Sequence, residues 1–142
     1  MKSIYITDEN GNFKKTDKLE KSSWIDLVSP TLEEIKEVAS ITKTDEDLLT
    51  KLMDDEELPR IENGDNATLI VIDTPYVTDI KYKHRYNTEP LGIIINNDGY
   101  FITISSKKQV ILDDFKEGKI KDFDVRKKTK FIIQILLKVA AT

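Results

Sequence analysis

The sequence predicts one domain of the α/β (α+β) class, spanning residues 1–142. The length of 142 residues is typical of a single folding unit. Short β-prone runs alternate along the chain with segments whose apolar residues recur at helical spacing. Hydrophobic residues make up 39% of the chain and cysteine is absent, so the fold has to come from a packed core rather than from disulfides.

The first strands are predicted in the N-terminal quarter. Residues 4–6 and the segment from Phe13 are expected to pair as a hairpin, because the sequence DENGN between them is rich in turn-forming residues. Residues 24–28, with the sequence WIDLV, predict a strand that is buried on both faces.

Two helices are expected next. The first is capped either by Ser29, with Pro30 in the first turn, or by Thr31, with Glu34 closing a capping box. The second begins at Thr44 as the cap and runs until Pro59 excludes helical geometry. The expected apolar faces are Leu32, Ile35, Val38 and Ala39 in the first helix and Leu48, Leu49, Leu52 and Met53 in the second.

The middle of the chain changes from helical to strand periodicity. Strands are predicted over 60–62 and 67–74, followed by a weaker extended segment over 76–86. Residues 91–96 and 100–105 flank the sequence NDG, which is the strongest hairpin signal in the chain.

The C-terminal part predicts a short helix over 110–115, a stop at Gly118 and a final helix over 126–142. Apolar side chains cover most of the final helix, and its narrow polar stripe consists of Lys130, Gln134, Lys138 and Thr142. So wide an apolar surface needs partners, yet it is too short and interrupted to cross a bilayer. The helical pattern reaches Thr142 without a cap or a glycine, so we expect a fragment of a longer protein.

Composition excludes several functions. The formal charge of −4 disfavours nonspecific nucleic-acid binding. The chain lacks the common glycine-rich phosphate loops and has one histidine, His84, in the basic segment KYKHRYN. No catalytic triad or thiolate site is indicated, so we predict no enzyme activity. The N-terminus carries no export signal.

The acidic run from Asp54 to Glu57 is the candidate metal site. It is expected at the C-terminal end of the second helix, where the helix dipole disfavours negative charge. Either Arg60 compensates it locally, or a hydrated divalent cation does so, because Mg²⁺ keeps several waters and needs one or two carboxylates.

Five segments taken in order carry a family resemblance. They are WIDLVSPTLEEIKEVA (24–39), DDEELPRIE (54–62), YNTEPLGIIIN (86–96), YFITIS (100–105) and TKFIIQILLKVA (129–140). This order resembles the cytoplasmic N-terminal domain of CorA-type magnesium/cobalt transporters. The resemblance implies an αβα sandwich with a mixed central sheet, followed in the complete protein by a stalk helix and two membrane helices with a Gly-Met-Asn pore signature.

The resemblance also implies a role. The full protein would be a homopentamer in the cell membrane, with this domain on the cytoplasmic side sensing intracellular Mg²⁺ and coupling it to the gate. The acidic pair of the best-known members aligns with Thr50 and Lys51 here, so Asp54 and Asp55, one turn later, are the predicted Mg²⁺ ligands. Co²⁺ or Ni²⁺ transport, a related zinc transporter and a stand-alone protein-interaction module are the alternatives.

Overall fold

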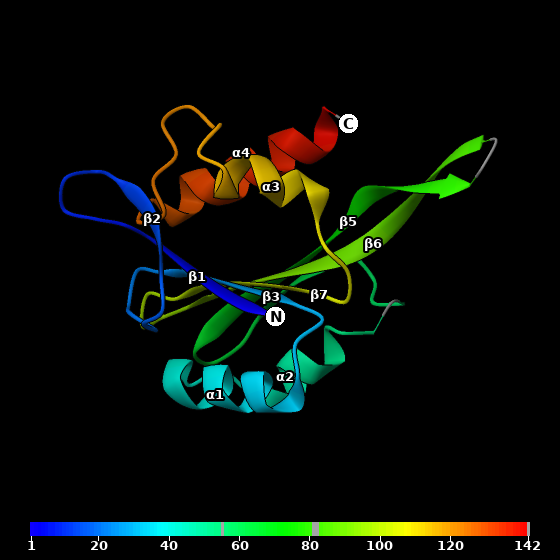
Figure 1. Ribbon diagram of the computed structural model, residues 1–142. Helices are drawn as coiled ribbons and strands as arrows, with labels where there is room; N and C mark the ends of the chain where they lie inside the picture. The colour runs from blue at the N-terminus through cyan, green and yellow to red at the C-terminus, as the bar shows by residue number, and fades with distance from the viewer. Residues whose placement is uncertain (55, 81–82, 142) are drawn as a thin grey trace.

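A seven-stranded mixed sheet organises the part of the chain that the computed structural model describes, which is residues 1–54, 56–80 and 83–141, with backbone only for 76–80 and 83–87. The strand order is β2-β1-β3-β7-β6-β5-β4. Helices α1 and α2 cover one face of the sheet, and α3 and α4 cover the other (Figure 1). This arrangement confirms the predicted αβα sandwich.

The elements have the following bounds. The strands are β1 Lys2–Thr7, β2 Phe13–Thr16, β3 Trp24–Val28, β4 Arg60–Asn63, β5 Ala67–Ile80, β6 Lys83–Asn96 and β7 Phe101–Ser105. The helices are α1 Leu32–Thr42, α2 Glu46–Lys51, α3 Val110–Lys116 and α4 Lys128–Ala140.

Both predicted hairpins are present. Between β1 and β2, the Asp8 carboxylate accepts hydrogen bonds from the amides of Asn10 and Asn12, at 2.9 Å each. Between β6 and β7, Gly99 adopts a φ of +94°, a left-handed conformation that a side chain would strain. The turn residues therefore set both registers, as the sequence indicates.

A buried polar network lies where β3 pairs with β7, which is the parallel pair among the described strands. The indole N–H of Trp24 donates to the Thr103 hydroxyl at 2.8 Å, and that hydroxyl donates to Asp26 Oδ1 at 2.7 Å. Lys116 Nζ, at the end of α3, lies 2.5 Å from Asp26 Oδ2. The network therefore ties both strands to the helix above them.

The capping box, rather than Ser29, begins α1. The Thr31 hydroxyl accepts a hydrogen bond from the Glu34 amide at 3.1 Å, and the Glu34 carboxylate accepts one from the Thr31 amide at 2.9 Å. Of the residues predicted for the apolar face of α1, Ile35, Val38 and Ala39 are buried. The prediction is wrong for Leu32, which is 54% exposed. The buried stripe begins at Ile35 and continues to Thr42.

The bounds predicted for α2 are wrong at both ends. Asp45 is the cap, since its carboxylate accepts a hydrogen bond from the Asp47 amide at 2.9 Å. The Thr44 hydroxyl is buried and forms a hydrogen bond with the Thr42 hydroxyl instead. The helix ends at Lys51, well before Pro59, because the chain from Leu52 onward folds into successive turns. Its apolar face is as predicted, and Leu49 and Leu52 are buried in the core.

Strands β5 and β6 are longer than predicted, with 14 residues each. Their pairing takes in the weak extended segment around residues 76–86, from Ala67 opposite Asn96 to Ile80 opposite Lys83. Beyond Asp73 neither β4 nor β7 pairs with them, so the two strands leave the sheet as a projecting ribbon (Figure 1).

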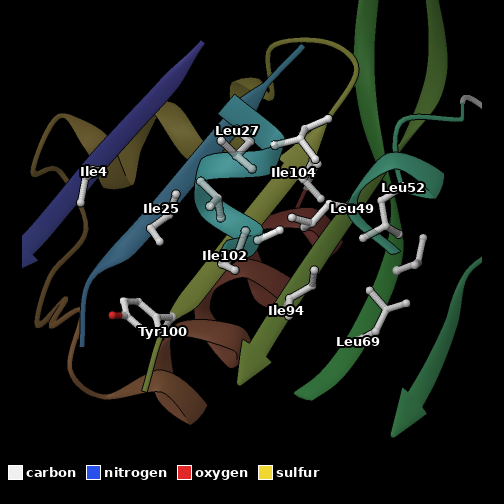
Figure 2. Packing of buried hydrophobic residues seen from close by; sticks show 14 residues of the cluster. Ile4, Ile25, Leu27, Leu49, Leu52, Leu69, Ile94, Tyr100, Ile102 and Ile104 are labelled. Atoms are coloured by element: carbon white, nitrogen blue, oxygen red, sulfur yellow. The ribbon is translucent and has the colours of Figure 1, made fainter. Parts of the chain in front are cut away.

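Two apolar clusters fill the sandwich. Figure 2 shows the cluster on the α1–α2 side, where Leu49 and Leu52 face Ile94 and Ile104 of the sheet. The cluster on the α3–α4 side is aromatic, and Phe131 of α4 stacks on Phe101 with ring centroids 4.4 Å apart.

Helix α4 begins two residues later than predicted, because Asp124 holds Arg126 and Lys127 in a turn.

Candidate metal site and docking face

The acidic segment after α2 is held in tight turns. The amides of Met53 and Asp54 donate to the carbonyls of Thr50 and Lys51, at 3.1 Å each. The Asp54 carboxylate accepts the Glu56 amide at 2.9 Å. Asp54 and Glu56 are both exposed. The exposed carboxylates therefore lie on a turn and not, as predicted, on the last turn of a helix.

Arg60 compensates part of this negative charge, as one of the two sequence interpretations expects. Its Nη1 lies 2.5 Å from Glu57 Oε2, and its Nε lies 2.5 Å from Glu62 Oε1. Glu57 and then Glu62 raise the pKa of the Arg60 guanidinium, so it stays charged. The same guanidinium donates to the Leu58 carbonyl at 3.0 Å and so braces the turn. Glu57 is committed to this ion pair, so the exposed carboxylates among the described residues of the acidic run are those of Asp54 and Glu56.

The positions aligned with the family's acidic pair supply no carboxylate here. Thr50 uses its hydroxyl to donate to the Glu46 carbonyl at 3.0 Å within α2. Lys51 is exposed at the end of the helix, where a positive charge suits the dipole. An ammonium at this position repels a cation, and the next carboxylate along the chain is that of Asp54.

The structure describes one of the two predicted metal ligands. Asp54 is described and exposed, whereas Asp55 lies outside the described residues. In residues 1–54, 56–80 and 83–141, no three His, Cys, Asp or Glu side chains gather into a group that could hold a metal ion. Hydrated Mg²⁺ needs one or two carboxylates, and the Asp54 carboxylate is accessible to such an ion. The site at Asp54 and Asp55 stays a prediction.

The basic segment around His84 lies on the projecting ribbon. His84 belongs to β6, and its backbone pairs opposite Asp79 of β5. The side chains of this segment lie outside the described part of the structure. The extended backbone agrees with the strand predicted for it.

Helix α4 buries one stripe and exposes another. Phe131 and Ile135 are fully buried against the sheet, while Ile133 is 51% and Leu137 is 64% exposed. The predicted polar stripe is partly used inside the domain, because Gln134 donates to the Lys121 carbonyl and Lys138 pairs with Asp114 of α3. None of the helices in the described ranges has the length and hydropathy needed to cross a bilayer. The exposed apolar stripe is thus a candidate docking face.

Sequence reasoning missed two ion pairs in which the carboxylate is buried. Asp26 pairs with Lys116, and Glu89, which is 5% exposed, pairs with Lys107 at 3.0 Å. A signal existed for the first, because an aspartate in the middle of the apolar run WIDLV has to find a partner when the strand is buried. Nothing in the sequence identifies which lysine supplies it.

The fold matches that of the soluble domain of CorA in a solved structure. The chain is similar to the soluble domain of CorA from Methanocaldococcus jannaschii, with 22% identity and a TM-score of 0.76 over 99% of this chain and 56% of that one. It is similar to the complete CorA magnesium transporter of the same organism, with 21% identity and a TM-score of 0.74 over 99% of this chain and 44% of that one. The ZntB cytoplasmic domain from Vibrio parahaemolyticus matches with 10% identity and a TM-score of 0.67, over 98% of this chain and 57% of that one.

A family model assigns the chain more specifically. The model described as CorA-like Mg²⁺ transporter protein matches residues 20–141, and the chain belongs to that family. The resemblance inferred from five short segments is therefore confirmed. The family is one of transporters rather than of enzymes, and this chain spans about half the length of the solved structures it matches. A comparison with curated protein sequences gives no match.

Proposed function

We propose that this chain is the cytoplasmic domain of a CorA-like divalent-cation transporter in the cell membrane, and that it senses intracellular Mg²⁺ and couples it to the gate. The family match over residues 20–141 is the observation that carries this proposal. The domain itself catalyses no reaction. The complete protein is a homopentamer that carries Mg²⁺, with Co²⁺ or Ni²⁺ as further substrates.

The sensing step rests on the acidic edge of the domain. Asp54 and Asp55 contribute carboxylates to a hydrated Mg²⁺ ion that joins neighbouring domains. Without the ion, exposed carboxylates on adjacent domains repel each other and the domains move apart. A ligand that binds the closed arrangement better shifts the population toward it, so Mg²⁺ closes the pore.

Removing both carboxylates tests this assignment. In the full-length transporter, the double variant Asp54→Ala, Asp55→Ala is expected to keep transporting but to need more intracellular Mg²⁺ for inhibition. The double variant Asp17→Ala, Glu33→Ala removes two exposed carboxylates elsewhere and serves as the control. Unchanged Mg²⁺ inhibition in the first variant would show that the site assignment is wrong.

Two other functions are favoured by specific observations. The exposed apolar stripe of α4 suits a stand-alone protein-interaction module. The likeness to the ZntB cytoplasmic domain suits the related zinc-transporter branch. The length of the reading frame separates the first from a transporter, because a transporter gene continues into a stalk helix, two apolar spans and Gly-Met-Asn. Metal uptake by cells that express the full-length protein separates the second.

A further inference from the structure

Strands β5 and β6 continue as a ribbon beyond their neighbours in the sheet. Pairing of β5 with β4 ends at Val71, and pairing of β6 with β7 ends at Gly92. Past these points, Pro75 of β5 and Pro90 of β6 lack the amide donor that a further neighbouring strand would need. Figure 1 shows the ribbon extending past the sheet, on the side away from α1 and α2. The ribbon therefore reaches beyond the body of its own domain.

Buried polar side chains tie the root of the ribbon to α3. The Thr74 hydroxyl hydrogen-bonds to the Glu89 carbonyl at 3.0 Å and to the side-chain amide of Gln109, the N-cap residue of α3. The Glu89 carboxylate lies 3.0 Å from Lys107 Nζ, in the segment between β7 and α3. Thr74, Glu89 and Gln109 are each 5% exposed or less. The ribbon is thus held in place at its root, and such pre-organisation lowers the entropic cost of docking.

The outer part of the ribbon is basic and rich in tyrosine. Residues 76–86 contain three Lys or Arg, one Asp and three of the five tyrosines of the chain. Because strand residues alternate between two faces, Lys83 and Arg85 belong to the same face of the ribbon. The single acidic residue, Asp79, pairs opposite His84 on the other face. Arg and Tyr are enriched in binding hot spots, so the face of Lys83 and Arg85 has the composition of a docking surface for an acidic partner.

The α2 surface, which we define as residues 45–57, is complementary to this face in charge. It contains seven Asp or Glu and one Lys, and Asp47, Asp54 and Glu56 are exposed on it. Within one domain, α2 covers one face of the sheet, whereas the root of the ribbon is tied to α3 on the other (Figure 1). A ribbon that extends away from its own α2 surface can reach that of another copy, where cations attract carboxylates.

We infer that the basic face of the β5–β6 ribbon docks on the α2 surface of a neighbouring copy of the same chain. This inference rests on the proposed function, because that function places copies of the domain side by side in a homopentamer. A contact between two different surfaces is heterologous, and heterologous contacts can repeat around a closed ring. Each copy then gives its ribbon to one neighbour and receives the ribbon of the other.

A disulfide between two copies measures this contact. Two differently tagged forms of the full-length transporter are co-expressed, with any cysteine after residue 142 replaced by serine. One form carries Thr78→Cys on the ribbon and the other carries Asp47→Cys. Residues 1–142 contain no cysteine, so a disulfide that joins the two tags has to form between copies.

The rate of this disulfide is compared with that of a control pair. In the control, Asp17→Cys replaces Asp47→Cys, because Asp17 is also acidic and exposed but follows β2 at the opposite edge of the sheet. With an added oxidant and saturating Mg²⁺, we expect the test pair to form the disulfide at least about tenfold faster, since docking raises the effective concentration of the two thiols.

Charge reversal tests the part played by the basic face. In the Thr78→Cys form, Lys83→Glu with Arg85→Glu is expected to slow the disulfide about tenfold, because carboxylates then meet carboxylates. Lys14→Glu with Lys15→Glu, on exposed residues of β2, makes the same charge change on another element and should leave the rate unchanged.

A complementary reversal separates lost attraction from a misfolded ribbon. Adding Glu46→Lys with Glu56→Lys to the Asp47→Cys form should restore the rate with the reversed ribbon, because opposite charges then meet again. A misfolded ribbon would not be rescued by changes on another copy. Added salt should slow the disulfide between the unreversed forms, because it screens the two surfaces from each other.

Three results would overturn the inference. A rate equal to that of the control pair means that the ribbon does not reach the α2 surface of a neighbour. A rate that survives the ribbon reversal means that charge does not select the contact. A loss that the complementary reversal leaves unrestored means that Lys83 and Arg85 bind something other than this surface. None of these results depends on Mg²⁺ inhibition of transport, and the mass of the purified protein tests the pentamer separately, so this inference and the proposed function can fail separately.

Discussion

Lys116→Met is expected to leave a buried carboxylate without its counter-charge. Asp26 is 1% exposed, and its Oδ2 lies 2.5 Å from Lys116 Nζ. Methionine keeps a flexible apolar stem of similar length but removes the ammonium. The carboxylate then retains only the Thr103 hydroxyl, at 2.7 Å from Oδ1, as a described side-chain partner.

The cost follows from the burial of the pair. Breaking a buried ion pair by removing one partner costs about 3 to 5 kcal/mol. The Lys116 side chain is 16% exposed, which lets water approach the vacated position and favours the lower figure of about 3 kcal/mol. Because domains of this size unfold with about 5 to 15 kcal/mol, the variant should lose a large part of its stability.

Urea unfolding of the 142-residue chain, followed by Trp24 fluorescence, measures this loss. Trp24 is the one tryptophan and is fully buried within the same network, so it reports on the transition. Lys119→Met removes a lysine that is 65% exposed in its ion pair and should leave the midpoint unchanged. Adding Asp26→Asn to Lys116→Met should recover stability, because asparagine keeps an acceptor for Thr103 without the charge. A loss below about 1 kcal/mol, or a double variant no more stable than Lys116→Met, would refute the reasoning.

Three further predictions concern α1 and the core. Thr31→Ala should cost about 1 kcal/mol in urea unfolding, because it removes the hydroxyl of the capping box, whereas Ser40→Ala on the exposed side of the same helix should not destabilise. The Thr31 amide holds the pKa of Glu34 below its ordinary value of 4.5, so Glu34 contributes stability above that pH and loses it as the pH falls through the lowered pKa. Glu34→Gln should therefore flatten the acid limb of stability against pH, and an unchanged limb would contradict this. Gly92→Ala should cost about 1 to 3 kcal/mol in thermal unfolding, since its Cβ would lie 3.0 Å from carbons of Leu52 and Ile104, while Gly64→Ala should be tolerated.

The sequence predicts elements well where a local signal decides the structure. Turn residues place both hairpins, and the Thr31–Glu34 capping box of α1 is one of the two caps that the sequence predicted. Errors arise where tertiary packing decides. Helix α2 stops at Lys51 because turns carry Leu52 into the core, and no local signal before Pro59 indicates that stop. The full length of β5 and β6 depends on their mutual pairing, which single-strand propensity does not reveal.

For the candidate site too, local features could be predicted from the sequence and long-range contacts could not. The acidic run is local and was predicted from the sequence, and its compensation by Arg60 was one of the two alternatives that the sequence offered. The exposed stripe of α4 was also predicted in outline, since its residues are apolar around most of the helix. Which stripe is buried depends on the aromatic cluster around Phe131, and that cluster joins residues from distant parts of the chain. The pairing of Asp26 with Lys116 is long-range in the same way and so escaped prediction.

The parallel pairing of β3 with β7 also constrains folding during synthesis. Trp24 and Thr103, which hydrogen bond across this pair, are 79 residues apart in sequence. Strand β3 therefore stays without its neighbour β7 until the ribosome has released that strand. Until then, Ile25 and Leu27 lack the partners that they have in the finished sheet. Long-range pairing of this kind is slow and leaves apolar surface open to aggregation. A nascent chain that pauses before Ser105 should consequently depend on chaperones, whereas one that has passed α4 should not.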